Sequence, residues 1–75
     1  MANLKFLVDA QRHLVCLPYS TDNLHAMASE LGIKRCWFHR DHYDVPKKMV
    51  AEVSLRAGVV RPREILAVIR GEMNG

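Results

Sequence analysis

The sequence predicts one small α/β or α+β domain, in which a three- to four-stranded sheet is covered by two to three helices. The expected order of elements is β-β-α-β-α-(β)-α. Short apolar runs near the N-terminus predict strands, and later segments with apolar residues at helical spacing predict helices. A chain of 75 residues, 49% of them hydrophobic, suffices for one core. We therefore expect residues 1–75 to form a single compact domain, with residues 72–75 as a frayed tail.

Four segments are expected to form the sheet. Residues 4–8 and 13–17 are short apolar runs separated by a short polar gap, which favours a β-hairpin. Residues 33–38 alternate weakly between polar and apolar and are rich in strand formers, so they predict a third strand. Residues 59–60 form a short extended link, which gives the optional fourth strand.

Three helices follow from caps and apolar spacing. The first begins after the N-capping residues 20–23 and ends at Gly32. Its apolar face consists of Leu24, Met27, Ala28 and Leu31. A second helix is expected over residues 45–57, with Asp44 as a possible N-cap. A third begins at Pro62, because proline suits the first helical position.

Charge and composition exclude several classes of protein. The net charge of +3 and the pI near 9.2 favour anionic partners only mildly, since the basic residues are spread along the chain. The sequence contains neither a phosphate-binding glycine loop nor a dinucleotide-binding fingerprint. It also lacks a signal-peptide pattern and any apolar run of membrane-spanning length. We therefore expect a cytoplasmic protein without membrane contact, either a monomer or a homo-oligomer.

The two cysteines do not indicate a disulfide scaffold or a zinc finger. Neither Cys16 nor Cys36 belongs to a Cys-x-x-Cys pair, and both lie in apolar, strand-like runs. We therefore expect two reduced, buried thiols.

The segment from residue 37 to residue 44 is the richest in functional groups. It holds two of the four histidines, two carboxylates, an arginine and three of the five aromatic residues. Such a segment is poor core material, because each buried polar atom needs a hydrogen-bond partner. It is therefore either a binding or reactive loop, or a tight polar turn.

One hypothesis for this segment is a metal site. His39, His42 and Asp44 offer the imidazole nitrogens and carboxylate oxygens that divalent metals bind, and Asp9 ends a predicted strand, where ligands of α/β sheets often lie. A minimal metal-dependent phosphodiester or phosphate hydrolase could use Asp9, His42 and Asp44. The structural alternatives are that Asp9 caps a turn or pairs with Arg12, and that Asp44 is a helix N-cap.

The favoured hypothesis is binding rather than catalysis. Lys47 and Lys48 fall in the first turn of the second predicted helix, where positive charge is unfavourable unless an anion binds there. The candidate binding residues are Arg12, Arg40, His42, Tyr43, Lys47 and Lys48. The partner would be an anionic ligand, a nucleic acid or a host protein. A further alternative is a protein-interaction or dimerisation module that uses the aromatic residues of segment 37–44.

Strand order decides whether Asp9 meets residues 39–44. If strands 4–8 and 33–38 run parallel, both polar segments lie at one end of the sheet. If instead strands 4–8 and 13–17 form a hairpin and a crossover helix follows, Asp9 lies at the far end and residues 17–19 neighbour the polar segment. The sequence leaves both arrangements open.

Several motifs resemble a known family. They are Leu7-Val8-Asp9 with Arg12, Asp22-Asn23-Leu24-His25-Ala26-Met27-Ala28, Leu31-Gly32-Ile33, Trp37-Phe38, His42-Tyr43-Asp44-Val45 and Ala57-Gly58-Val59-Val60. Over nearly its whole length the chain resembles small bacterial and phage proteins grouped as a domain of unknown function, the 4031 family. The resemblance implies a shared fold, a shared polar site and a small accessory protein, and it implies no particular reaction.

Overall fold

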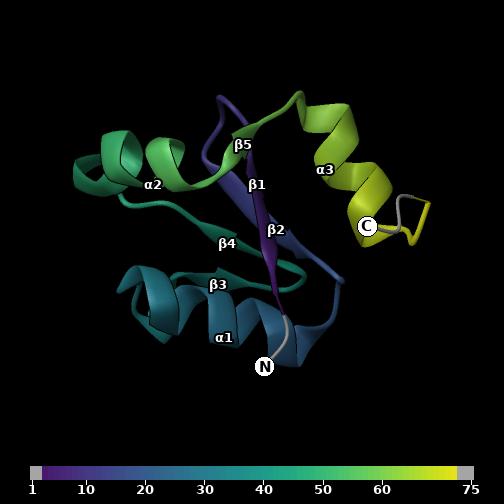
Figure 1. Cartoon of the computed structure of the whole chain (residues 1–75), viewed down its shortest axis with the longest axis horizontal. Helices are drawn as coiled ribbons and strands as arrows, with labels where there is room; N and C mark the ends of the chain where they lie inside the picture. The colour runs from purple at the N-terminus through teal and green to yellow at the C-terminus, as the bar shows by residue number, and fades with distance from the viewer. Residues whose placement is uncertain (1–2, 73–75) are drawn as a thin grey trace.

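A mixed sheet of five strands organises the part of the chain that the structure, a computed structural model, describes, residues 3–72. The strand order is β3-β4-β2-β1-β5, and three α-helices surround the sheet (Figure 1). The predicted α/β class is therefore confirmed, whereas the predicted number of three to four strands is wrong. The predicted tail lies mostly outside the described residues, because only Glu72 of it is described.

The elements have the following bounds. The strands are β1 (Lys5–Val8), β2 (His13–Leu17), β3 (Phe38–His39), β4 (His42–Asp44) and β5 (Gly58–Val59). The α-helices are α1 (Thr21–Leu31), α2 (Val50–Arg56) and α3 (Pro62–Ile69), and two short 3-10 helices are η1 (Arg35–Trp37) and η2 (Lys47–Met49). None of the helices within residues 3–72 is long and apolar enough to cross a membrane.

The helices divide between the two faces of the sheet. Tyr43 on β4 points towards α1, where its hydroxyl lies 2.6 Å from Nδ1 of His25. An ion pair of 3.5 Å between Glu30 of α1 and Arg56 of α2 joins these two helices. Side chains alternate along a strand, so His42 lies on the opposite face from Tyr43. The helix α3 covers this opposite face and lies separate from α1 and α2 (Figure 1).

The core lies between these layers and takes residues from every predicted apolar run. The fully buried side chains include Leu14, Val15 and Cys16 of β2, Leu24 and Met27 of α1, Tyr43 and Val45, and Val53 and Val68 of the later helices. The first helix forms as expected: Ser20 Oγ accepts the backbone N–H of Asn23, and Gly32, with a φ of 79°, ends it.

Residues 33–38 do not form the predicted strand. The backbone N–H of Trp37 donates to the carbonyl of Lys34 at 3.0 Å, so the chain turns through η1, and only Phe38 and His39 join the sheet. The residues of η1 are exposed, and a strand there would have had no face to bury. Cys36 lies in this turn and is exposed, so the prediction of two buried thiols holds only for Cys16.

The second predicted helix begins later than expected. The helix α2 starts at Val50, and Lys47 and Lys48 lie in η2 instead of a helical first turn. Pro46 disfavours helical geometry at Val45, whose backbone N–H donates instead to the carbonyl of Arg12 at 2.9 Å. The prediction that Asp44 caps this helix is therefore wrong.

The strand order follows the hairpin alternative. Strands β1 and β2 pair antiparallel, and α1 leads to β3, which lies beyond β4. The hydroxyl of Tyr19 donates to the backbone carbonyl of Asp41 at 2.8 Å, so residues 17–19 neighbour the turn between β3 and β4. Strand β4 then runs back along β2 and places Asp44 opposite His13. This return of the chain assembles the site described next.

Candidate metal centre

A tight turn between β1 and β2 buries the carboxylate of Asp9. The side chain of Asp9 is 0% exposed, and its Oδ1 accepts the backbone N–H groups of Gln11 and His13, both at 2.9 Å. Arg12 takes a left-handed conformation with a φ of 68°, which lets the chain reverse in so few residues. Asp9 is thus the turn cap that the structural alternative proposed.

The second oxygen of Asp9 orients His13. Oδ2 lies 2.9 Å from Nδ1 of His13. An ionised carboxylate can only accept a hydrogen bond, so Nδ1 carries the proton. In a neutral imidazole with this tautomer, Nε2 keeps its lone pair, which is the state in which a histidine binds a metal ion.

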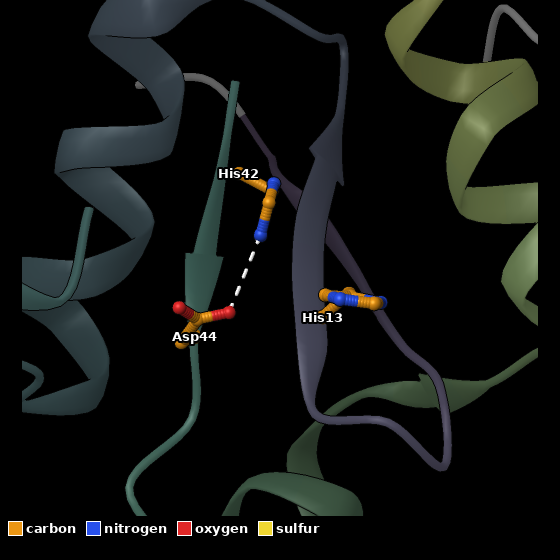
Figure 2. A group of neighbouring side chains, drawn as sticks. All are labelled: His13, His42 and Asp44. Carbon is orange, nitrogen blue, oxygen red and sulfur yellow. Dashed lines mark ion pairs between the residues drawn. The ribbon is translucent and has the colours of Figure 1, made fainter. Parts of the chain in front are cut away.

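The register of β2 and β4 brings three ligand-type side chains together. His13 lies directly opposite Asp44, and His42, two residues before Asp44 in β4, lies on the same face. Each of these residues offers one ligand atom, and the three atoms lie within 4.8 Å of one another. Figure 2 shows His42 and Asp44 next to each other on β4 and His13 on the neighbouring strand β2. We call them the His-His-Asp cluster.

His42 is flanked by two carboxylates. Its Nδ1 lies 2.8 Å from Oδ1 of Asp41, and its Nε2 lies 3.3 Å from Oδ1 of Asp44 (Figure 2). If Nδ1 donates to Asp41, then Nε2 and the Asp44 oxygen are both electron-pair donors. Two such atoms facing each other need a cation between them, either a proton or a metal ion.

The imidazole rings of the cluster are packed against each other. The rings of His13 and His42 are perpendicular, with centroids 4.9 Å apart. The neighbouring residue, Tyr43, anchors β4 from the other face, where it packs against Phe38 and His25. Burial raises the pKa of the Tyr43 hydroxyl, an effect that the nearby Arg35 charge partly offsets. Tyr43 is therefore a neutral structural anchor for the strand that carries His42 and Asp44.

A pocket of ≈ 220 Å³ adjoins the cluster. Its lining residues are Gln11, His13, Asp41, His42, Pro62, Ile65, Leu66 and Ile69. The two histidines of the cluster thus line a hollow between the sheet and α3 that could admit a small molecule.

The structure brings together only part of the predicted metal-site set. His42 and Asp44 lie in the His-His-Asp cluster. Asp9 does not, because both of its oxygens are used by the turn and by His13. His39 is exposed on β3 with its ring centroid 5.5 Å from that of His42, and it lies outside the cluster.

The predicted binding residues are spread along the molecule. Arg40 lies in the turn between β3 and β4, with a φ of 61°, whereas Lys47 and Lys48 follow the other end of β4. Tyr43 is buried on the face towards α1 and offers no free surface. Among the described residues, only His42 of this set belongs to the His-His-Asp cluster.

His13 is the cluster residue that is absent from the candidates predicted from the sequence. Its signal was local: a histidine that opens a strand, four residues after an aspartate that ends one. An aspartate in a tight turn bonds the backbone a few residues on, which brings its carboxylate to the side chain at the start of the next strand. The second signal is the pairing of His13 with Asp44. It depends on the register between two strands, which the sequence alone does not specify.

Comparisons with known proteins identify the family. Residues 7–72 match the family described as protein of unknown function (DUF4031). Neither the curated proteins nor the solved structures that were compared with the chain gave a match. The matched range contains the His-His-Asp cluster together with Asp9 and Asp41. The chain belongs to the DUF4031 family of proteins of unknown function.

Proposed function

We propose that this protein binds one divalent transition-metal ion, with zinc as the best fit, through His13, His42 and Asp44. The observation that carries the proposal is that three ligand atoms from two paired strands lie within 4.8 Å of one another. Two imidazoles and one carboxylate form a donor set that suits zinc and related ions better than magnesium or calcium.

The spacing of His42 and Asp44 supports this proposal. Ligands at about 2.0–2.1 Å from a tetrahedral zinc ion lie about 3.3 Å from each other. The distance between Nε2 of His42 and Oδ1 of Asp44 is 3.3 Å. The ion would therefore replace the proton that the two atoms otherwise need, and His13 of the neighbouring strand would be the third ligand.

The carboxylates behind both histidines also support a metal site. Asp9 contacts Nδ1 of His13, and Asp41 contacts Nδ1 of His42. Metal-binding histidines in proteins usually donate their second nitrogen to a carboxylate or carbonyl, which fixes the tautomer and the ring. Two histidines of one cluster that share this arrangement are better explained by a common ion than by two unrelated ion pairs.

Three protein ligands leave a fourth position for water or another ligand. This is the arrangement of catalytic rather than structural zinc sites. A bound ion would supply Lewis-acid chemistry, so the reaction class that follows is metal-assisted hydrolysis at a centre held by His13, His42 and Asp44. The ion would also supply the positive charge for the anionic ligand that the sequence led us to expect.

Calorimetric titration of the purified chain with zinc, manganese and magnesium tests the proposal. We expect one equivalent of zinc to bind, manganese to bind more weakly and magnesium not to bind measurably. His42→Ala should abolish stoichiometric zinc binding. His39→Ala is the matched control, because His39 is an exposed histidine on the neighbouring strand and should leave binding unchanged.

Two results of this titration would contradict the proposal. The first is zinc binding of equal affinity in the parent chain and in His42→Ala. The second is loss of binding in His39→Ala, which would move the ion to the edge of the sheet. Circular dichroism of both variants ensures that folded proteins are compared.

A further inference from the structure

The geometry points to a ligand class for this centre: a small carbonyl or carboxylate compound with an apolar side chain that packs against α3. The inference rests on the proposed metal ion, and it adds which class of metal-binding ligand the pocket walls would select. Three features carry it, namely the composition of the pocket walls, their charge and the size of the hollow.

The pocket has one polar wall and one apolar wall. The polar wall comprises Gln11, His13, Asp41 and His42, and the apolar wall comprises Pro62, Ile65, Leu66 and Ile69 of α3. Small-molecule sites in proteins typically combine an apolar lining with a few polar groups that fix orientation. A ligand that fills this hollow therefore carries a polar head next to an apolar group.

The exposed side chain of Leu66 marks the apolar wall as accessible. Leu66 is 49% exposed although it lies beside the buried Ile65. A single exposed leucine on a helix needs no explanation, as Leu55 of α2 illustrates. Leu66 differs because it lines a hollow that also contains two metal-ligand histidines. Apolar surface that a ligand covers there contributes to binding in proportion to its area.

The charge of the centre favours a neutral or singly charged head group. Among the described residues that line the pocket, none is lysine or arginine, whereas Asp41 adds a negative charge. A divalent ion held by two neutral histidines and Asp44, with the carboxylate of Asp41 beside His42, has its charge offset to about zero. Such a centre suits a neutral carbonyl oxygen best, tolerates one carboxylate as a metal ligand, and leaves a polyphosphate or a nucleic-acid backbone without counter-charge.

The volume restricts the apolar group to a small one. Sites for drug-sized ligands are about 300–1,000 Å³, and this pocket is ≈ 220 Å³. A short aliphatic chain or a single aromatic ring fits this range, as does one side chain of a longer molecule whose remainder stays outside.

A series of hydroxamates tests the inference, because these probes share one zinc-binding head and differ in apolar size. The full chain, loaded with one equivalent of zinc, is titrated calorimetrically with acetohydroxamate, butyrohydroxamate and benzohydroxamate. We expect the affinity to rise about fourfold for each added methylene that becomes buried. Benzohydroxamate should bind more tightly than acetohydroxamate by at least tenfold.

Two leucine-to-alanine variants locate the apolar contact. Leu66→Ala should reduce the gain in affinity between acetohydroxamate and benzohydroxamate by several-fold, without changing the affinity for zinc. Leu55→Ala removes an 88% exposed leucine from α2, away from the pocket, and should leave the gain intact.

The outcomes separate this inference from the proposed metal site. If zinc binds but affinity is equal along the series, or if the gain survives in Leu66→Ala, the ligand class is wrong and the metal site stands. If no zinc binds in the control titration, the metal site fails and the ligand class fails with it.

Discussion

Two aspartates in this protein, Asp9 and Asp41, each contact the ring nitrogen of a histidine. Asp9 is fully buried and holds the turn, so its removal would disturb the fold as well as His13. Asp41 has the same relation to His42, but its side chain is 45% exposed. Comparing variants of Asp9 and Asp41 therefore separates two roles of a carboxylate: orienting a histidine and stabilising the fold.

We predict that Asp41→Asn weakens zinc binding by about 10-fold or more, as loss of such an orienting carboxylate usually does. The free energy of unfolding of the metal-free protein should change by less than about 1 kcal/mol, because Asp41 is partly exposed. Calorimetry and urea unfolding measure the two quantities. Unchanged zinc affinity would show that His42 needs no orienting partner. Asp9→Asn, as comparison, should lower both quantities.

The two cysteines should differ in reactivity. Cys36 is exposed in η1, whereas Cys16 is buried in β2 and burial raises the pKa of its thiol to about 11. The thiolate is the reactive form, so Cys16 is both inaccessible and protonated at neutral pH. Labelling with a chromogenic disulfide reagent at pH 8 should give one fast thiol in the native protein and two in urea. Cys36→Ser should leave no fast thiol in the native state.

The raised pKa of Cys16 also predicts a loss of stability at high pH. Below pH 9.0 the thiol is protonated in both states, and above it the unfolded chain loses this proton while the folded chain keeps it until about pH 11. The contribution is therefore present below pH 9.0 and falls by about 1.4 kcal/mol per pH unit through this window. Urea unfolding from pH 8 to 11 should show a shallower decline in Cys16→Ala than in the parent chain.

At the scale of elements, the first helix depends on its N-cap. Ser20 Oγ accepts the backbone N–H of Asn23 at 3.0 Å. We predict that Ser20→Ala lowers the free energy of unfolding by about 1 kcal/mol. Ser29→Ala is the control, because Ser29 is exposed within α1 and alanine has the higher helix propensity. Equal stability of the two variants in urea unfolding would show that the cap is dispensable.

Local signals explain which elements the sequence predicted. The strands β1 and β2 and the helices α1 and α3 have their own apolar pattern, caps or proline, and the structure contains them close to the predicted bounds. Residues 33–46 were misassigned because long-range contacts decide them. Val45 is held extended by the carbonyl of Arg12, and Phe38 and His39 become a strand only because β4 is there to pair with them.

The candidate site also combines residues with a local sequence signal and a residue that only long-range contacts place. His42 and Asp44 stand out in the sequence as chemistry-bearing residues, and both lie in the His-His-Asp cluster. Their partner His13 was hidden, because its place opposite Asp44 is a property of register between strands distant in sequence. The sequence could therefore indicate the polar segment that contributes to a site but not the strand that completes it.

At the scale of the whole molecule, a metal ion would join parts of the chain that a small core holds only modestly. A 75-residue domain buries a limited apolar surface. His13 opens β2 and Asp44 closes β4, so an ion bound to both would cross-link two neighbouring strands. The unfolded chain holds these ligands far apart and binds the ion more weakly. Metal binding should therefore be coupled to folding.

We predict that zinc raises the midpoint of thermal unfolding and that a chelator reverses the effect. At free zinc 100 times the dissociation constant, the added stability is about 2.7 kcal/mol, or roughly 10–20 °C for a domain of this size. Differential scanning calorimetry with and without zinc, and after addition of EDTA, measures this shift. His42→Ala should show none, and His39→Ala should show the full shift. A shift of equal size in both variants would mean that zinc stabilises the fold elsewhere, because only His42 of these two residues can connect β4 to β2 through the ion.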